Sequence, residues 1–300
     1  MTTTVDPELI RPAPPTMASP SWWGADSDRH RVLPAHSATP GAFVKVTRPA
    51  SAAYLHLPTV FGAARAAGEA GIGPQVLHTD PAARTLVLED FTGRAKTATL
   101  HDFLDHPLVH RYLALRRTVD RLAVPDPRRA TVFDDIRSLR ALTERQATVL
   151  PEDLPWMLRV LDDAEQRIAA TGYDTEFCHG DGNVSNVLID AAGRPYLVDW
   201  DVAAVMDPLQ DIGAVLAELA PSDDDARELF ESAWGRWDAK LFDRARVYGI
   251  ADLVRWGLVG AYVNSVDPGT FEYSKFSDWQ FLRARWALAA SQLDDRFRNL

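Results

Sequence analysis

The sequence predicts an α+β fold with two lobes: a small N-terminal lobe built on a β-sheet with one helix, and a large, mostly helical C-terminal lobe. Three observations lead to this class. Short runs of β-forming residues precede residue 91, apolar residues recur at helical spacing after residue 92, and 300 residues suffice for a large core. We expect a flexible arm at residues 1–20, a first lobe at 21–91 and a second lobe at 92–300.

The arm is predicted from composition. Residues 1–20 are rich in proline, serine and threonine, which disfavours a packed core. They lack the basic start and apolar run of a signal peptide, and the chain has no apolar run near the ~18 residues that cross a bilayer. We therefore expect a cytoplasmic protein without a membrane partner.

The small lobe is predicted to be a sheet crossed by one helix. Arg29–Ala35 and Ala42–Arg48 are rich in β-forming residues and flank the turn residues HSATPG, so they predict a hairpin. Leu57–Gly71 is rich in alanine and ends in glycine, which predicts a helix. Pro74–Asp80 and Arg84–Phe91 predict a second strand pair around DPAA.

The large lobe is predicted to be helical apart from one hairpin. Apolar residues recur at helical spacing in residues 100–124, 153–172, 207–220, 225–264 and 276–298. Asn186–Asp190 and Tyr196–Trp200 are short apolar runs separated by AAGRP, which predicts a β-hairpin.

Polar residues gather around this hairpin. Asp181 and Asn186 lie in the loop before it, and Asp199 closes its second strand. A hairpin folds Asn186 and Asp199 toward each other, and two oxygen ligands suit Mg²⁺, which takes few protein ligands. Asp181 is then free to orient or deprotonate a hydroxyl group. Phosphoryl transfer needs such a set: a positioned acceptor, an in-line phosphate and a metal.

The run HGDGNVSN fits the pattern H-x-D-x-x-x-x-N, and the downstream VDW supplies an aspartate. In these residues the chain resembles the catalytic core of the aminoglycoside phosphotransferase and choline kinase superfamily, relatives of the protein kinases. The resemblance implies a protein-kinase-like fold that uses ATP and Mg²⁺. It implies that Asp181 is the catalytic base, that Asn186 and Asp199 bind the metal, and that His179 braces the loop.

The segment DPLQDIG extends the resemblance. It places Asp207 and Asp211 as in the family's D-P-x-x-D-[LI] segment, where the first aspartate caps a helix and the second supports the catalytic loop. Only WDVAAVM separates Asp199 from Asp207, so the long activation segment of protein kinases is missing. Gly180 stands where protein kinases carry an arginine that engages an activation-loop phosphate. We therefore expect a constitutively assembled small-molecule kinase.

The small lobe is expected to bind the nucleotide. Lys45 lies in the middle of a strand and resembles the lysine that contacts the α- and β-phosphates; a lysine facing solvent is the alternative. Gly24 and Ser27 are candidates for the turn over the phosphates, with residues 37–41 as a rival. The segment expected to bond the adenine edge consists of Glu89, Asp90 and Phe91.

One departure from the family concerns the partner of this lysine. Kinase relatives pair it with a glutamate on the small-lobe helix, and the expected position falls near Val60, where the sequence has no carboxylate. Glu69 lies too close to the helix end to replace it. Three alternatives follow: another residue replaces the pair, Asp199 and phosphate hold Lys45 alone, or activity is reduced as in a non-catalytic pseudokinase.

The acceptor pocket is expected in the C-terminal helices. The aromatic run from RWGL to RARW is similar to the choline kinase subgroup, and the candidate contacts are Trp256, Tyr262, Tyr273 and Trp279. Aromatic faces attract ammonium groups, although such residues also build helical cores. Asp252, Asp267 and Glu272 are alternative contacts for the amines of an aminoglycoside-like compound. An amino alcohol and an antibiotic acceptor both remain open, with a sugar third.

The composition argues against a nucleic-acid partner. The formal net charge is −10, the isoelectric point is about 5.3, and the sequence shows no basic patch. An acidic protein is compatible with a hydroxylated, cationic small molecule. The single cysteine, Cys178, excludes an intramolecular disulfide. No pattern in the sequence sets an oligomeric state or selects between ATP and GTP.

Overall fold

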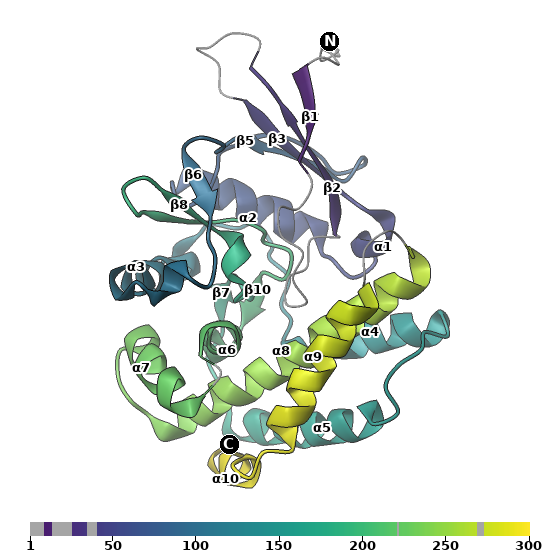
Figure 1. Ribbon diagram of the computed structural model, residues 1–300. Helices are drawn as coiled ribbons and strands as arrows, with labels where there is room; N and C mark the ends of the chain where they lie inside the picture. Colours follow the sequence, from purple (N-terminus) through teal and green to yellow (C-terminus); the bar gives the residue numbers. More distant parts are fainter. Residues whose placement is uncertain (1–8, 14–25, 35–40, 221, 269–272) are drawn as a thin grey trace.

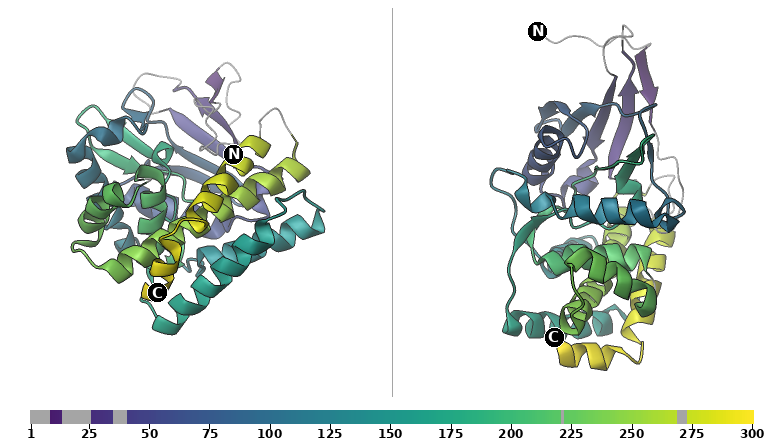
Figure 2. Two further views of the ribbon diagram at one scale, coloured as in Figure 1. Left: turned by 60° about the horizontal axis from the view of Figure 1, so that its bottom comes forward. Right: turned by 90° about the vertical axis from the view of Figure 1, so that its left-hand side faces the viewer.

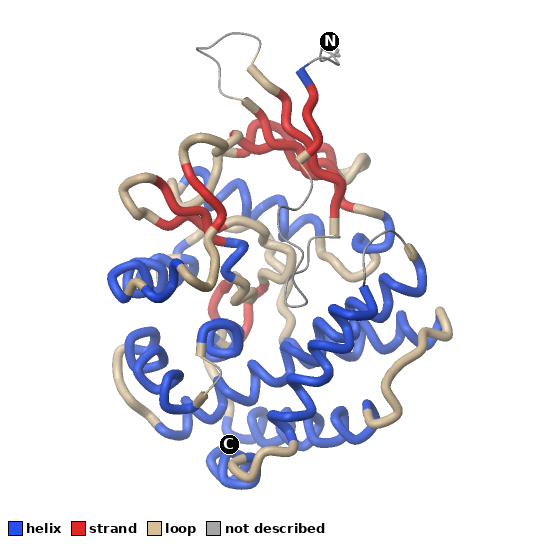
Figure 3. Tube along the Cα trace, viewed as in Figure 1, coloured by secondary structure: helices blue, strands red, loops and turns tan. Residues whose placement is uncertain are grey.

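A computed structural model describes residues 9–13, 26–34, 41–220, 222–268 and 273–300. In these residues an antiparallel sheet and one long helix form the small lobe at the top of Figure 1, and helices form most of the large lobe below it. Figure 3 shows the same division, with strands gathered above and helices below. The predicted fold class is therefore confirmed.

The small lobe contains a five-stranded sheet with the order β1-β2-β3-β5-β4 in its described residues. Its strands are β1 (Ile10–Pro12), β2 (Ser27–Val32), β3 (Ala42–Thr47), β4 (Val76–Asp80) and β5 (Thr85–Glu89). The helix α2 (Leu57–Glu69) lies beside the sheet, and its buried residues pack in one apolar cluster with Leu86 of β5. The expected hairpin and second strand pair correspond to β2–β3 and β4–β5.

The small lobe differs from the prediction at two points. Ile10–Pro12, inside the expected arm, forms β1 and pairs with β2 through the register Ile10↔Val32. A one-turn helix, α1 (Pro49–Ala52), adds to the single helix that we expected, and Pro49 begins it. Both elements are too short to give a periodic pattern, since they depend on pairing or on a local proline rather than on amphipathic spacing.

The large lobe consists mainly of helices that surround the long helix α8, as the two views in Figure 2 show. The helices are α3 (His106–Arg116), α4 (Val132–Arg145), α5 (Leu154–Thr171), α6 (Pro208–Leu219), α7 (Asp223–Trp234), α8 (Ala239–Val266), α9 (Tyr273–Leu288) and α10 (Leu293–Asn299). The short 3₁₀ helices are η2 (Asp102–Leu104), η3 (Val119–Arg121) and η4 (Val184–Asn186).

Two small sheets flank the loop that carries the H-x-D-x-x-x-x-N motif. The expected hairpin is present as β8 (Val187–Asp190) and β9 (Pro195–Leu197), and β6 (Ala95–Thr97) joins it as a third strand. A second pair consists of β7 (Glu176–Cys178) and β10 (Ala204–Met206). The sequence did not predict β6 or β10, because a three-residue strand shows no alternation of its own.

The predicted helix over residues 225–264 is divided in two. Gly235 takes a left-handed conformation with φ of +89° and ends α7, which glycine allows without a steric penalty. Asp238 then caps α8 by accepting hydrogen bonds from the backbone of Lys240 and Leu241. Apolar periodicity continues through both helices, so only the glycine marks the break.

None of the described helices combines the length and the apolar character that a membrane span requires.

Helices α6 and α8 approach each other closely through two glycines. A Cβ atom on Gly213 would lie 2.1 Å from the carbonyl oxygen of Ala245, and one on Gly249 would lie 2.6 Å from the carbonyl oxygen of Gly213. Since both clashes are with backbone, a side chain there forces the helices apart. This contact places α6, which follows the catalytic loop, against the core helix α8.

We expect Gly213→Ala to destabilise the protein by about 1–3 kcal/mol or more, because the added methyl group overpacks this helix contact. Urea denaturation measures the change. The control is Asn264→Ala, a substitution at an exposed position of α8 that should change stability by less than about 0.5 kcal/mol. Equal stability of the wild type and Gly213→Ala would contradict the close packing of α6 and α8.

Candidate active site

The loop from His179 to Asn186 joins β7 to β8 and carries the H-x-D-x-x-x-x-N motif. Gly180 has φ of +77°, and a Cβ atom there would lie 2.9 Å from the carbonyl oxygen of Val202. Glycine is therefore required by both conformation and space. This explains why the arginine of protein kinases has no place at this position.

Asp181 lies at the centre of the loop and is nearly buried. Its Oδ1 accepts a hydrogen bond from the backbone of Asn183 at 2.8 Å, and its Oδ2 accepts one from Asn186 Nδ2 at 2.8 Å. Asn183 caps η4 by accepting hydrogen bonds from the backbone and hydroxyl of Ser185. Burial raises the pKa of Asp181 to about 7.

His179 is fully buried between the loop and the end of the hairpin. Its Nε2 donates to the carbonyl oxygen of Val198 at 3.0 Å, and its ring packs against Trp200 with centroids 4.6 Å apart. Burial lowers the pKa of His179 to about 4, so the ring is neutral at pH 7. The backbone of Val198 also donates to the carbonyl oxygen of Asn186 at 3.0 Å. These contacts bring Asn186 and Asp199 to the same end of the hairpin.

A buried ion pair between Arg116 and Asp211 holds the backbone of the loop. Asp211 accepts a hydrogen bond from the backbone of Gly180 at 2.6 Å and binds the guanidinium of Arg116 with both oxygens. Arg116 Nη1 donates to the carbonyl oxygen of Asp181 at 2.8 Å. The expected roles in DPLQDIG are confirmed, since Asp207 caps α6 and Asp211 holds the loop. Sequence reasoning missed Arg116, which lies 65 residues away from Asp181 in the chain.

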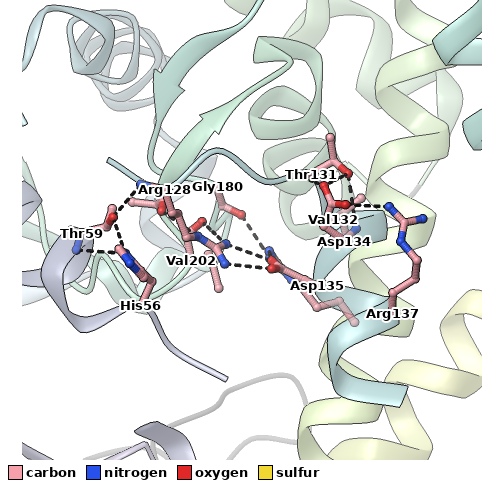
Figure 4. Close-up of polar contacts among 12 residues, drawn as sticks. His56, Thr59, Arg128, Thr131, Val132, Asp134, Asp135, Arg137, Gly180 and Val202 are labelled. Carbon is pink, nitrogen blue, oxygen red and sulfur yellow. Dashed lines mark hydrogen bonds and ion pairs between the residues drawn. The ribbon is translucent and has the colours of Figure 1, made fainter. Parts of the chain in front are cut away.

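A second set of ion pairs reaches the loop from α4 and α8 (Figure 4). Arg255 Nη2 donates to the carbonyl oxygen of Gly180 at 3.2 Å, and Nη1 lies 3.3 Å from Asp135 Oδ2. Asp135 also binds Arg128 with both oxygens, at 2.8 and 3.0 Å. One carboxylate on α4 thus holds two arginines, and one of these arginines contacts the catalytic loop.

Arg128 extends this set to the small lobe, as Figure 4 shows. Its side chain donates to the carbonyl oxygens of Val202 and Ala203, which follow Asp199 and Asp201 in the chain. Its backbone N–H donates to Thr59 Oγ1 of α2 at 2.8 Å, and His56 Nδ1 lies 2.8 Å from the same hydroxyl group. The helix of the small lobe is therefore linked to the catalytic loop by polar contacts.

Lys45 is buried in β3 and points at carboxylates rather than at solvent. Its Nζ lies 2.5 Å from Asp199 Oδ1, 2.9 Å from Asp201 Oδ1 and 2.7 Å from Asp26 Oδ2. Burial opposes the charged ammonium group, but Asp199, Asp201 and Asp26 outweigh that effect and raise the pKa of Lys45. Arg29 lies opposite Lys45 on β2 and binds Asp26 at 2.6 Å.

Asp26 answers the question of the missing helix glutamate. Val60 is buried in the apolar cluster, and Glu69 is the last residue of α2. The carboxylate that pairs with Lys45 in the small lobe comes from Asp26 instead, one residue before β2. Sequence reasoning could not find it, because only the pairing of β2 with β3 brings Asp26 and Lys45 together.

The acidic cluster has the donor chemistry of a site for a hard cation. Carboxylate oxygens of Asp26, Asp199 and Asp201 lie within 4.8 Å of one another, and oxygen ligands at such spacing suit Mg²⁺. Asn186 lines the same cavity. Asp199 has φ of +66°, which is uncommon for a residue other than glycine and occurs most often at functional sites. The residues therefore fit a divalent metal ion.

The remaining candidates for nucleotide contacts lie at different places. Ser27 donates to Asp26 Oδ2 and accepts from Arg29 Nε, so its hydroxyl supports the acidic cluster. Gly24 lies outside the described residues. In the segment Glu89, Asp90 and Phe91, three backbone groups are already engaged: the Glu89 N–H donates to Gln75, the Asp90 N–H donates to Gly41, and the Phe91 carbonyl accepts from Arg94 and Ala95.

A cavity of about 40 Å³ adjoins Asp181, and of the four aromatic candidates only Trp256 lines it. Tyr262 is buried against Tyr54, and Tyr273 accepts a hydrogen bond from Arg48. Trp279 packs edge-on against Trp286. These three side chains face other surfaces of α8 and α9, which helical spacing alone does not reveal.

Several lining residues were not predicted. They are Ala214, Ala217, Glu218, Leu253, Gln280 and Arg283. Asp252, which the sequence offered as an alternative contact, also lines the cavity. Helices α6, α8 and α9 contribute these residues, and only their packing brings the three helices to one place.

Comparisons with known proteins agree with this geometry. Residues 20–250 match the model of the phosphotransferase enzyme family. No curated protein sequence matches the chain significantly. The chain therefore belongs to the phosphotransferase enzyme family, and the resemblance to the aminoglycoside phosphotransferase and choline kinase superfamily is confirmed.

Three solved structures show the same fold. A choline/ethanolamine kinase family protein from Mesorhizobium loti is 22% identical, with 92% of this chain and 90% of that chain covered and a TM-score of 0.75. Choline kinase LicA from Streptococcus pneumoniae is 17% identical, with 90% and 92% covered and a TM-score of 0.75. The GDP and kanamycin complex of APH(2")-IIia is 13% identical, with 93% of each chain covered and a TM-score of 0.60. LicA is also known in complex with AMP.

We expect Asp135→Asn to destabilise the protein by up to about 3–5 kcal/mol, because it leaves the partly buried Arg128 without a carboxylate and the buried Arg255 with Asp252 alone. Urea denaturation provides the measurement. The control, Glu165→Gln, removes a carboxylate from a more exposed pair with Arg137 and should cost about 0–1 kcal/mol. A small, equal effect of both substitutions would show that Asp135 does not hold the two arginines.

Proposed function

We propose that this protein is an ATP- and Mg²⁺-dependent kinase that phosphorylates a hydroxyl group of a compact small molecule. The observation that supports it most directly is the convergence of Asp181, Asn186 and Asp199 on one cavity that also reaches Asp26. Membership of the phosphotransferase family agrees with this activity. The pseudokinase alternative is based on the absence of a helix glutamate that pairs with Lys45. Asp26 pairs with Lys45 in its place.

The proposed reaction transfers the γ-phosphoryl group in one step. The acceptor hydroxyl oxygen bonds to the γ-phosphorus, the bond from that phosphorus to the β–γ bridging oxygen breaks, and ADP leaves. Asp181 orients the hydroxyl group and takes its proton, a role that its position in the cavity and its raised pKa support.

Other residues hold the nucleotide and the metal in this proposal. Asn186 and Asp199 are the metal ligands, and Lys45 binds the α- and β-phosphates. When bound there, Mg²⁺ offsets the negative charge that develops on the transferred group. The Glu89 carbonyl and the Phe91 N–H are left to contact the base, because the Glu89 N–H, the Asp90 N–H and the Phe91 carbonyl are engaged within the chain. The AMP and GDP complexes of structural neighbours support a nucleotide site.

The acceptor in this proposal is small and carries an ammonium group. Glu218 and Asp252 line the cavity with Trp256 and Phe276, and carboxylates and aromatic faces both favour cations. These contacts suit an amino alcohol, with an aminoglycoside-like antibiotic or a sugar as the alternatives. A panel of all three acceptor types with radiolabelled ATP or GTP tests the class. ATP binding without transfer to any compound would favour the pseudokinase alternative.

We expect Asp181→Asn to lower kcat by about 100- to 10,000-fold with little change in ATP affinity, because it removes the proton acceptor while keeping the shape of the side chain. Steady-state kinetics and calorimetric titration of ATP measure the two effects. Asp174→Asn, at an exposed position before β7, is the matched control and should keep wild-type kcat. Preserved turnover in Asp181→Asn would remove its assignment as the base.

We expect Asp199→Asn to raise the Mg²⁺ concentration for half-maximal activity by about 10-fold or more, since a proposed metal ligand loses its charge. Titration of Mg²⁺ at saturating nucleotide measures this change. Asp162→Asn, which lies exposed on α5, should leave the Mg²⁺ requirement unaltered. An unaltered requirement in Asp199→Asn as well would contradict the ligand role.

A further inference from the structure

Arg283 reaches the acceptor cavity from α9. Its guanidinium donates to the carbonyl oxygen of Ala217 and to Gln280 Oε1, the latter at 3.4 Å. Among the described residues, no carboxylate oxygen lies within 4.0 Å of its guanidinium nitrogens. Arg283 is half-buried and lines the cavity, and the hydrogen bonds of its guanidinium group go to uncharged oxygen atoms.

Other buried arginines of the chain behave differently. Arg116 binds Asp211 with both oxygens, Arg128 binds Asp135 in the same way, and Arg255 contacts Asp135 and Asp252. These arginines are structural, because each is neutralised within hydrogen-bonding distance. Burial lowers the pKa of Arg283 despite the more distant charges of Glu218 and Asp252, which agrees with a charge that lacks a close partner.

A planar guanidinium group is suited to bind a carboxylate through two parallel hydrogen bonds. An anionic group on the acceptor would satisfy Arg283 in the cavity, where Ala217 and Gln280 supply only partial charges. Burying a charge without a partner is costly, so a ligand that brings the opposite charge gains affinity. The arginine is thus explained as part of a binding site better than as part of the core.

The opposite charge is present on the same cavity. Glu218 lines it, is largely buried, and accepts a hydrogen bond from the backbone of Val184. Asp252 is already paired with Arg255, so Glu218 is the better partner for an incoming ammonium group. The cavity therefore offers three chemically different contacts: Asp181 for a hydroxyl group, Glu218 for a cation and Arg283 for an anion.

We propose that the acceptor is a compact hydroxylated amino acid, whose carboxylate binds Arg283, whose ammonium group binds Glu218 and whose hydroxyl group faces Asp181. The inference rests on the proposed kinase function and narrows its acceptor class. Bond formation and proton transfer are those given above, so the amino acid becomes its O-phosphate and ATP becomes ADP.

Matched pairs of compounds test the role of the carboxylate. L-serine and ethanolamine differ only in that group, and so do L-homoserine and 3-aminopropan-1-ol. We expect kcat/KM, measured by ADP release, to be about 10- to 100-fold higher for the carboxylated member of at least one pair, the range for a hydrogen bond between charged groups. Calorimetric binding to the protein with Mg²⁺ and a non-hydrolysable ATP analogue gives a second readout that does not require turnover.

Variants of Arg283 connect this preference to the residue. Arg283→Gln should remove the preference by weakening the carboxylated member about 10- to 100-fold while changing the amino alcohol little, and Arg283→Lys should restore part of it. Arg285→Gln is the matched control, since it lies two positions away on α9 and pairs with Asp153 outside the cavity. It should leave the preference intact, and thermal unfolding shows that each variant is folded.

The outcomes separate the two proposals. Equal binding within both pairs, no binding of any carboxylated member, or a preference that survives in Arg283→Gln overturns the amino acid acceptor and leaves the kinase proposal standing. Binding that depends on the carboxylate and on Arg283, without phosphate transfer, supports the anion contact and overturns the kinase proposal. Transfer with the predicted preference supports both.

Discussion

The buried pair of Arg116 and Asp211 is the interaction on which the site depends most. Asp211 accepts the N–H of Gly180, and Arg116 donates to the carbonyl oxygen of Asp181, so the backbone on both sides of the proposed base is fixed by one ion pair. The pair is fully desolvated, and removal of either partner would leave an uncompensated buried charge. Gly180 is part of this arrangement, because its positive φ turns the loop so that its N–H meets Asp211 and the carbonyl oxygen of Asp181 meets Arg116.

A second consequence of burial is the way in which the lobes share charge. Three carboxylates, two of them from the large lobe, meet at Lys45 on the sheet of the small lobe, and Arg29 adds a second cation. Such a cluster ties the lobes together through charge, in addition to the apolar cluster that α2 shares with the large lobe. The proposed metal site and the lobe contact use the same carboxylates.

The acceptor side of the cavity is built differently from the nucleotide side. It is formed where α6, α8 and α9 meet, and the close approach of α6 to α8 through Gly213 and Gly249 brings small residues of α6 to its wall. The fold is shared with a choline/ethanolamine kinase family protein, choline kinase LicA and APH(2")-IIia. A fold does not determine its substrate, so the acceptor must be inferred from charged residues such as Glu218 and Arg283.

The sequence by itself determined the fold class, the loop that carries the H-x-D-x-x-x-x-N motif, the hairpin that follows it, the cap at Asp207 and the support of the loop by Asp211, because these features depend on local periodicity, turn chemistry and a contiguous motif. Only the tertiary structure decided which partner Lys45 has, which arginines hold the loop and which aromatic residue reaches the cavity. The physical reason is that ion pairs and cavity walls join residues far apart in the chain, while short strands and helix rotations that bring them together leave no periodic signal of their own.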